Sequence, residues 1–500
     1  MTSRTRRPRI RRGRPALAAG AGLALAAGLL TVPAAQATTA TGPSAKRLHD
    51  DFNGDGYPDL AIGAPGTALG SLPKAGAITV LYGSASGLST SRKQVLSWAA
   101  RENADSPETG YGSGVRTADL DEDGYADLLS VVSWTPMDGD HGTFIEVNWG
   151  GPKGLSARPT VLSGLPDAMA MRDFAVADVD GDHHPDLVRL GIHPDSAQAD
   201  GAVVHGPFTR DSPGTRTTYF TVDPDRSAQA RSLAAGDVNG DGIADLAVRT
   251  SSPDESDSRG IALLTGGPDG LTRKGFPKDA QGRPVGGEEV AIGDLNKDGY
   301  GDIVVGHSFD GYDSDVEMPT RGGALGVVYG GPNGVSGTRK PVWINQDTPG
   351  VPGAGERGDG MGSGLSIGDT DGDGYLDVAT GLPGEDLDGV TDAGRVLVLR
   401  GGANGLTGTG ARSFGQNTGG VPGTAEKADR FGAETALVDG DGDRKDGLAV
   451  GDPDENASDG SVWIFPPASS GITARGSFSF GPGTVRLPRT GALFGRSLGD

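Results

Sequence analysis

The sequence predicts an all-β fold: a seven-bladed β-propeller whose C-terminal strand completes the first blade. Three observations lead to this prediction. A ten-residue acidic phrase occurs seven times in 500 residues, strand-like runs follow it, and the last residues supply a strand that the first unit lacks. The composition agrees, because 87 glycines and 33 prolines suit short strands joined by turns, and an aromatic content of 5% is too low for a large helical core.

The N-terminal segment is predicted to be a secretory signal peptide. Residues 1–37 contain seven arginines and no acidic residue, then an apolar run of 17 residues from Ala16 to Val32, and end in small residues. This order is typical of a signal peptide, cleaved in this chain after Ala37, and the apolar run is shorter than the ~20 residues of a membrane anchor. We therefore expect an extracellular protein with a linker at 38–49 and a propeller at 50–500. The pair Arg11-Arg12 leaves twin-arginine export open, although general secretion fits the following residues better.

The charge of the mature chain limits its partners. The formal net charge is −22, and loss of the seven N-terminal arginines makes it −29. So acidic a surface repels nucleic acid and anionic membranes. The chain has no cysteine, so disulfides do not stabilise the exported protein. We expect a monomer without a membrane span, whose partner is an extracellular protein or glycan.

The acidic phrase marks the units of a repeat, with copies that begin 57 to 75 residues apart. A short leading run of the form Gly-x-Ser/Ala-Leu/Val precedes the later copies, and an aliphatic run that ends in Gly and often Pro follows the phrase, as in 60–65. After a variable loop comes another strand-like run, as in 77–83, 324–330 and 395–401, and then a turn. Runs of five to seven residues bounded by Gly and Pro predict strands, so each unit is a blade of three or four antiparallel strands.

The two ends of the repeat are complementary. The first unit begins with its phrase and lacks a leading strand, whereas residues 494–500 are a leading strand with no phrase after it. A ring in which the final strand completes the first blade explains both features and removes exposed sheet edges. An open solenoid is the alternative, but it predicts capping ends instead of complementary ones.

The phrase Asp-x-Asp/Asn-x-Asp-Gly-x-x-Asp predicts a calcium site. It places oxygen side chains at positions one, three, five and nine and a backbone carbonyl at seven, which suits the six to eight oxygen ligands of Ca²⁺. Without an ion the carboxylates would repel one another. The five well-formed copies supply, in that order, Asp51, Asn53, Asp55, Tyr57 and Asp59; Asp119, Asp121, Asp123, Tyr125 and Asp127; Asp237, Asn239, Asp241, Ile243 and Asp245; Asp294, Asn296, Asp298, Tyr300 and Asp302; and Asp369, Asp371, Asp373, Tyr375 and Asp377.

Two copies depart from the pattern. The third has His183 at position six, where Gly allows positive φ, but histidine tolerates that region and we expect binding. Its ligands are Asp178, Asp180, Asp182, His184 and Asp186. The seventh copy offers only Asp439, Asp441 and Asp443 in register, and whether it binds metal is left open. An EF-hand or dockerin is not favoured, because position twelve is not a bidentate Glu and a strand follows the loop.

The acidic phrase, the Phe/Met-Gly leading strand and the Gly-Ala-Pro exit resemble FG-GAP repeats, the units of the integrin α-subunit N-terminal propeller. The resemblance covers about residues 50–500. It implies a seven-bladed propeller with calcium in loops between the first two strands of each blade and ligands on the opposite face. The units around Asp178, Asp237 and Asp294 have weak Phe-Gly pairs, and the other integrin domains are absent, so cell adhesion follows by analogy only.

The leading functional hypothesis is a secreted, calcium-stabilised binding module without catalysis. A lectin-like propeller is the closest alternative, but it wants exposed aromatic loop residues, for which Trp98 and Trp134 are the candidates. A propeller-bearing hydrolase needs a catalytic domain for which no residues remain. The GxSxG matches at 364–368 and 495–499 lie in leading strands and lack the helix of a nucleophile elbow. The Arg-Gly-Asp at 357–359 aligns with 427–429 and is read as an inter-blade loop.

The face opposite the calcium loops is expected to bind the ligand, because long variable loops on a rigid scaffold often carry recognition. The loops at 306–322 and 381–393 are long, and their acids are expected to be unpaired. These acids are Asp310, Asp313, Asp315, Glu317, Glu385, Asp386 and Asp388. Solvated loop charges are the alternative reading. On the functional reading the partner is cationic or bridged by a further divalent ion.

Overall fold

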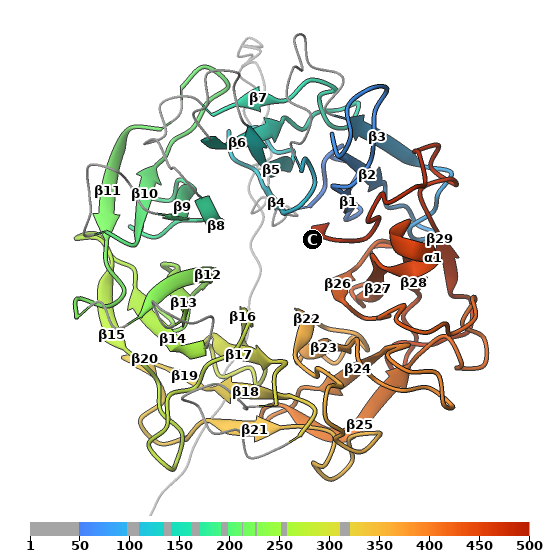
Figure 1. Cartoon of the computed structure of the whole chain (residues 1–500). Coiled ribbons are helices and arrows are strands. Elements are labelled where there is room, and N and C mark those ends of the chain that lie inside the picture. Colours follow the sequence, from blue (N-terminus) through green and yellow to red (C-terminus); the bar gives the residue numbers. More distant parts are fainter. Residues whose placement is uncertain are drawn as a thin grey trace, which may run out of the picture. The chain divides into compact units, whose positions relative to one another are not determined.

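The computed structural model describes residues 50–97, 110–134, 142–162, 171–191, 199–212, 214–225, 228–251, 258–310 and 321–499. This part of the chain forms seven four-stranded antiparallel sheets, which stand around a ring (Figure 1). One helical turn, α1 (Glu455–Ser458), occurs among the described residues, and none of their helices is long and apolar enough to cross a membrane. The predicted seven-bladed propeller is therefore confirmed, and each blade has four strands.

The strands of each blade run in a fixed order from the innermost outwards. Blade 1 has β30 (Leu498–Gly499), β1 (Leu60–Ala64), β2 (Ala77–Leu81) and β3 (Lys93–Ser97). Blade 2 has β4 (Val115–Ala118), β5 (Asp127–Trp134), β6 (Gly142–Asn148) and β7 (Thr160–Val161). Blade 3 has β8 (Met171–Ala177), β9 (Asp186–Gly191), β10 (Gly201–His205) and β11 (Arg216–Phe220). Blade 4 has β12 (Gln229–Gly236), β13 (Asp245–Ser251), β14 (Ser258–Thr265) and β15 (Thr272–Gly275).

The remaining blades follow the same order. Blade 5 has β16 (Glu289–Gly293), β17 (Asp302–His307), β18 (Ala324–Val328) and β21 (Val342–Ile344), with a small hairpin of β19 (Gly330–Gly331) and β20 (Gly334–Val335). Blade 6 has β22 (Ser363–Gly368), β23 (Asp377–Leu382), β24 (Arg395–Arg400) and β25 (Thr407–Phe414). Blade 7 has β26 (Glu434–Val438), β27 (Gly447–Asp452), β28 (Ser461–Phe465) and β29 (Phe478–Phe480).

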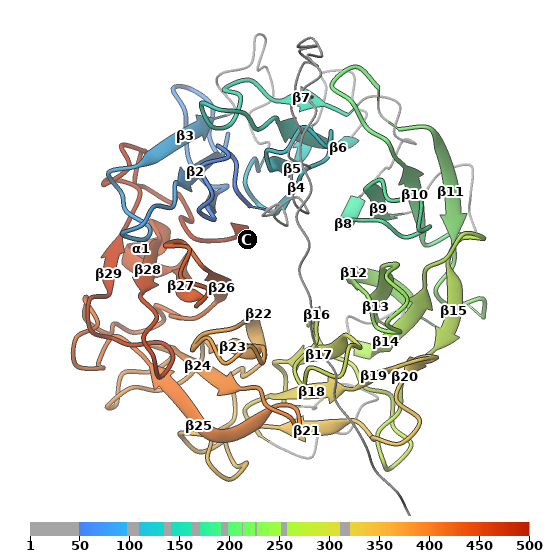
Figure 2. The same cartoon turned by 180° about the vertical axis from the view of Figure 1, so that it is seen from behind.

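The C-terminal strand β30 supplies the innermost strand of blade 1. It pairs antiparallel with β1, where Leu498 is opposite Ile62 and Gly499 is opposite Ala61. It also contacts β26 of blade 7 and β4 of blade 2, so the innermost strands form a continuous circle of neighbours. Seen from behind, β4, β8, β12, β16, β22 and β26 all face the centre (Figure 2). Blade 1 thus takes its strands from both ends of the propeller sequence.

The hydrophobic core is divided into layers between neighbouring blades. Each of the seven buried clusters joins the sheets of two adjacent blades. The second and third strands of a blade are therefore covered on both faces, and all five residues of β1 are buried. This explains why such strands are continuous aliphatic runs without polar alternation. The layer between blades 7 and 1 contains Phe494 and Leu498, so it is built like the others.

Glycine pairs allow neighbouring blades to approach closely. A Cβ on Gly63 at the end of β1 would lie 2.0 Å from the carbonyl oxygen of Gly112 in the next leading segment, and a Cβ on Gly451 would lie 2.3 Å from that of Gly495. Any side chain at these positions would separate the two backbones. The Phe-Gly and Gly-Ala-Pro elements of the repeat therefore meet each other across the blade junction.

Candidate metal centre

The acidic phrases connect the first and second strands of the blades. In blade 2 the phrase begins at Asp119, directly after β4, and its ninth residue, Asp127, is the first residue of β5. In blade 1 the phrase leads into β1, while the innermost strand comes from the C-terminus. Because antiparallel strands alternate in direction, these loops and the third-to-fourth connections share one face of the ring. The second-to-third and inter-blade connections share the other.

The first aspartate of each phrase holds the loop in a tight turn. Asp51 accepts backbone hydrogen bonds from Gly54 (2.7 Å) and Asp55 (3.2 Å) on Oδ1 and from Gly56 (2.8 Å) on Oδ2. Positions four and six need positive φ, which is 72° at Gly54 and 89° at Gly56. His183 adopts φ 71° at position six of the third copy, as predicted. The seventh copy has the same turn, with φ 68° at Arg444.

The residues at position seven are also placed alike. Each donates its backbone N–H to the carboxylate at position five, over distances of 2.9–3.3 Å. These residues are Tyr57, Tyr125, His184, Ile243, Tyr300 and Tyr375. In blade 7, Lys445 donates in the same way to Asp443 at 3.0 Å, so this bond of the loop is present in all seven blades despite different side chains.

The ninth aspartate joins the loop to the third strand. Asp59 is fully buried, and its Oδ2 accepts the N–H of Phe52 at 3.0 Å while its Oδ1 accepts that of Gly83, just after β2, at 2.8 Å. The same pair of bonds occurs in five further blades, at Asp127, Asp186, Asp245, Asp302 and Asp377. This carboxylate therefore has a structural role besides any contact with a cation.

Burial and neighbouring carboxylates make these aspartates unusual acids. Burial, with smaller contributions from the charges of Asp51 and Asp55, raises the pKa of Asp59 to about 8. Burial likewise raises the pKa of Asp127 and Asp302 to about 7. The charged form of a buried carboxylate is costly unless a cation offsets it. A positive ion in the loop would therefore favour the ionised form of these carboxylates.

Several loops bring their oxygens close enough to share one cation. One carboxylate oxygen from each member lies within 4.8 Å of the others in the sets Asp119, Asp121 and Asp127; Asp178, Asp180 and Asp182; and Asp369, Asp371 and Asp377. In addition, Oδ1 of Asp121 is buried and has no hydrogen-bond partner. Oxygens bound to one Ca²⁺ at about 2.3–2.6 Å have this spacing, so the residues fit that ion.

Two residues that the sequence reasoning missed reach into the acidic loops from the third strands. In blade 3, Nδ1 of His205 lies 2.9 Å from Asp180 and 3.4 Å from Asp186. In blade 6, Arg400 ion-pairs with Asp371 and Asp377 at the same two loop positions. Each of these basic residues stands before the glycine that follows its third strand. An alignment of the third strands would have revealed them, because tyrosine occupies this position in blades 1 and 5.

Basic side chains also contact three other loops. Arg92 ion-pairs with Asp55 at 2.7 Å, Arg210 bridges Asp121 and Asp123 at 3.0 Å each, and Lys445 contacts Asp443. Among the described residues, no lysine or arginine forms an ion pair with the acidic phrase of blade 4 or blade 5. The phrase of blade 5 contains Lys297, whereas that of blade 4 has no basic residue of its own, so the charge of the blade 4 phrase is the less compensated of the two.

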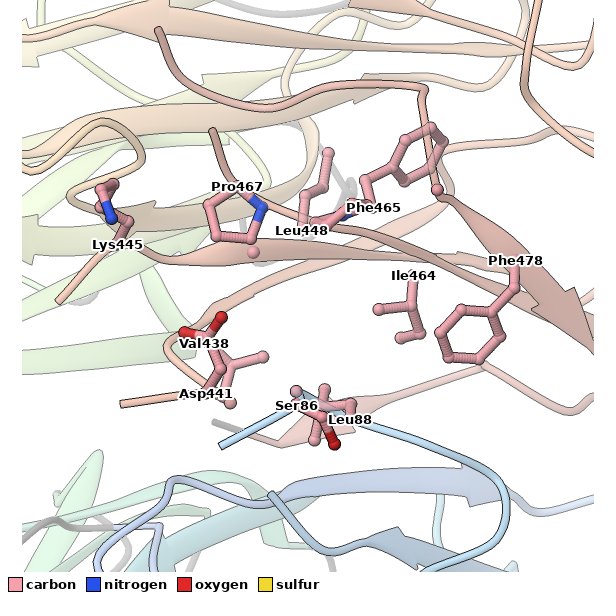
Figure 3. Close-up of a pocket in the computed structure, with 15 residues that line it drawn as sticks. Ser86, Leu88, Val438, Asp441, Lys445, Leu448, Ile464, Phe465, Pro467 and Phe478 are labelled. Atoms are coloured by element: carbon pink, nitrogen blue, oxygen red, sulfur yellow. The ribbon is translucent and has the colours of Figure 1, made fainter. Parts of the chain in front are cut away.

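The seventh phrase lacks the ninth aspartate, because Gly447 occupies that position. Its next acid, Asp446, turns to the neighbouring blade, where Oδ2 accepts the N–H of Asp369 at 2.7 Å. A cavity of about 150 Å³ lies beside this loop, between blades 7 and 1, with Asp441 and Lys445 at one end and Ile464 and Phe478 at the other (Figure 3). Typical ligand pockets have about 300–1,000 Å³, so this space suits at most a small group.

Four of the seven acids that were predicted to be unpaired on the opposite face have hydrogen-bond partners. Asp310 accepts the N–H of Gly322 and of Gly358, Glu385 accepts the amide of Gln346, Asp386 accepts the N–H of Asp392, and Asp388 accepts the amide of Asn417. The prediction of unpaired charge is therefore wrong for these four, which brace their loops. Asp313, Asp315 and Glu317 lie outside the described residues.

The motifs set aside in the sequence are structural where the chain is described. Ser366 shares a hydrogen bond with Thr435 (2.9 Å), and Ser497 donates to the carbonyl of Gly112 (2.8 Å), so both GxSxG serines are buried in blade contacts. Asp359 of the Arg-Gly-Asp tripeptide is buried and accepts the N–H of Glu356. Trp98 lies outside the described residues, and only the backbone of Trp134 is described.

Known proteins share parts of this repeat. The FG-GAP repeat model matches residues 49–81, 230–263 and 361–399, each of which includes an acidic phrase. Integrin alpha-6 of Homo sapiens is 37% identical over 120 residues, which are 24% of this chain and 9% of that protein. Phosphatidylinositol-glycan-specific phospholipase D of Rattus norvegicus is 38% identical over 90 residues, which are 18% of this chain and 10% of that enzyme.

This chain thus spans about a tenth of the length of each of these two relatives. Among solved structures, the biofilm matrix protein Bap1 of V. cholerae aligns with 85% of this chain and 61% of its own, at 12% identity and a TM-score of 0.25, which is too low to establish a common fold. The repeat matches agree with the sheets and loops described above. The chain therefore carries FG-GAP repeats and folds as an integrin-like, seven-bladed β-propeller.

Proposed function

We propose that this chain is a secreted, calcium-binding propeller that acts as a non-catalytic binding module for an extracellular ligand. The observation that carries the calcium assignment is the buried, charge-loaded acidic loop that recurs around one face of the ring. Asp59 illustrates it, because a fully buried carboxylate with a pKa of about 8 lies beside two further acids of its loop. A divalent ion would lower the cost of this arrangement.

The loops are proposed to differ in calcium affinity. The phrase of blade 4 contains no basic residue and has no lysine or arginine partner among the described residues, so it should bind most tightly. In blade 6 the guanidinium of Arg400 already contacts Asp371 and Asp377, so an ion must displace it. In blade 3 His205 and Arg216 both approach Asp180, at 2.9 and 2.7 Å, and compete in the same way.

The number of bound ions tests the calcium assignment. The phrase of blade 4 accepts the change Asp241→Asn without loss of shape, because Oδ1 can still accept the N–H of Ile243, now 2.9 Å away. We expect native mass spectrometry to find one calcium ion fewer in this variant. The matched control is Asp443→Asn in blade 7, whose phrase has no ninth aspartate, and it should leave the ion count unchanged. Equal counts in wild type and Asp241→Asn would contradict the assignment.

A binding role is supported by the absence of a catalytic arrangement at either GxSxG segment among the described residues and by the similarity to integrin alpha-6. Recognition is proposed for the face opposite the acidic phrases, where the second-to-third and inter-blade connections lie. Glycans are the second candidate ligand class. A glycan array probed with the mature protein in calcium and in EGTA tests this choice: calcium-dependent signal on defined sugars favours a lectin, and a blank array favours a protein ligand.

Export is the remaining part of the proposal. The mature chain should begin at Thr38, after loss of the arginine-rich segment. N-terminal sequencing of protein recovered from the medium of an expressing host checks this. Recovery of the protein only inside cells, with Met1 retained, would refute secretion.

A further inference from the structure

A second acidic cluster lies at the junction of blades 6 and 7, away from the acidic phrases. Asp452 ends β27, Glu455 begins α1, and Asp429 lies in the connection from β25 to β26 (Figure 1). One carboxylate oxygen of each lies within 4.8 Å of the other two. The acidic phrase of blade 7 meets β27 at its other end, at Gly447, so a six-residue strand of roughly 17–20 Å separates the two places.

Hydrogen bonds fix each carboxylate but leave one buried oxygen without a partner. Oδ1 of Asp452 accepts the N–H of Asp454 (3.1 Å) and of Glu455 (2.8 Å), and Oδ2 of Asp429 accepts that of Glu426 (2.7 Å). Asp452 is 0% exposed and no N–H or hydroxyl donor contacts its Oδ2, so only a proton shared with Glu455 or a cation would satisfy this oxygen. An unpaired buried oxygen is costly, so it calls for a ligand or a proton.

The amide of Gln416 adds a further oxygen at this junction. Its nitrogen donates to Oε2 of Glu455 at 3.0 Å, while the other oxygen of Glu455 accepts the amide of Asn456 at 2.9 Å. Gln416 is 4% exposed, and its own oxygen Oε1 is buried without a partner. Two orphaned oxygens, from Asp452 and Gln416, therefore accompany the three carboxylates.

The preceding junction, between blades 5 and 6, has the same frame without the extra charge. There Asp359 accepts the N–H of Glu356 at 2.7 Å and Glu385 accepts the amide of Gln346 at 2.9 Å, as Asp429 and Glu455 do in the later junction. The residues that differ are a facing pair on the second and third strands. Leu382 pairs with Arg395 in blade 6, whereas Asp452 pairs with Ser461 in blade 7.

This exchange makes the junction of blades 6 and 7 more negative by two charges. Arg395 approaches Glu385 at 3.8 Å and supplies a cation to the earlier junction. Among the described residues, no lysine or arginine forms an ion pair with Asp429, Asp452 or Glu455. The nearby Arg430 lies 3.7 Å from Asp454 instead. At the facing pair, the later junction therefore has an acid in place of Leu382 and lacks the cation Arg395, although Asp310 also places its charge near Asp359 in the earlier junction.

The pKa values of two of these acids are raised. Burial, followed by the charges of Glu455 and Asp429, raises the pKa of Asp452 to about 9. Burial, followed by the charges of Asp429 and Glu426, raises the pKa of Glu455 to about 7. Three carboxylates cannot all ionise in this space at neutral pH without a counter-charge.

We propose that the junction of blades 6 and 7 binds one hard divalent cation, held by Asp429, Asp452 and Glu455 with the amide oxygen of Gln416. An all-oxygen donor set with three carboxylates suits Ca²⁺ or Mg²⁺ better than the softer transition metals. The ion occupies the charge position that Arg395 fills one blade earlier. It would join two blades on the face opposite the acidic phrases, so it is separate from the calcium loops.

Ion counting on the full mature protein tests this site, with CaCl₂ as the probe. Native mass spectrometry should find one calcium ion fewer in Asp452→Asn, which keeps Oδ1 for its two backbone partners. The double variant Asp452→Leu/Ser461→Arg reproduces the pair of blade 6 and should also bind one ion fewer. Its melting temperature in EGTA should equal or exceed that of the wild type, because the uncompensated buried acid is gone.

The control separates this site from the calcium loops. Asp241→Asn in blade 4 should remove a different ion, so a combination with Asp452→Asn should lose two. If the acidic phrases bind no calcium, the wild type should hold this ion alone and Asp452→Asn none. The proposal is overturned if Asp452→Asn and the double variant both retain the wild-type ion count, in which case the three acids share protons instead.

Discussion

Two phenylalanines at equivalent positions allow the stability of the junction that closes the ring to be compared with that of an internal blade junction. Phe431 precedes Gly432 in the leading segment of blade 7 and bridges to Gly394 of blade 6. Phe494 precedes Gly495 in the segment that enters blade 1 and bridges in the same way to Gly460 of blade 7. Both side chains are 0% exposed and make edge-on aromatic contacts. Closure by the C-terminus is therefore built from the same contact as an internal junction.

The expected magnitude follows from this burial. Truncation of a buried Phe to Ala costs about 3–5 kcal/mol of the free energy of unfolding. A propeller of about 450 residues has an unfolding entropy near 0.95 kcal/mol/K, at about 2.1 cal/mol/K per residue. Phe494→Ala and Phe431→Ala should therefore each lower the melting temperature by about 3–5 °C in scanning calorimetry.

The comparison between the two variants decides the question. A ring closed only loosely would lose little from Phe494→Ala, so a drop below about 1 °C beside a full drop for Phe431→Ala would refute the reasoning. Deletion of residues 494–500 is the harsher test. It removes the bonds from Gly63 N–H to Ser497 (2.8 Å) and from Gly495 N–H to Gly63 (2.9 Å) and exposes an edge of β1, so the truncated protein should aggregate. A stable, monomeric truncation would favour an open array.

Three further predictions concern cations and protons. If five loops fill at 10–100 times their dissociation constants, each ion adds about 1.4–2.7 kcal/mol, so excess EGTA should lower the melting temperature by about 7–14 °C; an unchanged curve would rule out stabilising calcium. In EGTA the raised pKa values of Asp59 and Asp127 mean that the folded state keeps protons that the unfolded state releases above about pH 4. Without metal, the urea concentration at half-unfolding should therefore decrease as the pH is raised from about 5 to about 8, and calcium should make it less dependent on pH. An increase with pH in the absence of metal would contradict this prediction. Arg400→Tyr, which places the residue of blades 1 and 5 in blade 6, should raise the calcium affinity of that loop by about tenfold in calorimetric titration, because a buried ion pair no longer competes; unchanged affinity would mean that Arg400 does not obstruct the ion.

The sequence predicted the blades because their signals are local and repeated. The phrase at Asp119 contains its own turn and its own ninth aspartate, so spacing alone places it between two strands. The leading strand missing from the first unit and present at the end of the chain identified the partner of β1 in the same way. The conformation of His183 also follows locally, since its position in the phrase requires positive φ.

The charges around the loops were harder to predict because they come from distant parts of the chain. His205 lies 25 residues beyond Asp180, and Arg400 lies 29 residues beyond Asp371; both reach their acids only through the pairing of the second and third strands. The acids of the opposite face were misjudged for a related reason. Their partners are backbone and amide groups of neighbouring turns, such as Gln346 for Glu385, which composition does not reveal.

Blade 7 differs from the other blades in which end of its second strand carries an aspartate. In five blades the second strand begins at a buried aspartate of the acidic phrase and in blade 1 directly after one, whereas β27 begins at Gly447 and ends at Asp452. In β27 the aspartate is therefore at the end of the strand instead of at its start. Arginines do lie inside two other second strands, at Arg189 and Arg249, but in β27 the aspartate lies at the end of the strand, where the following turn supplies backbone partners. Under the two proposals above, a cation position lies at either end of a second strand, and the residues at those ends decide which face of a blade is used.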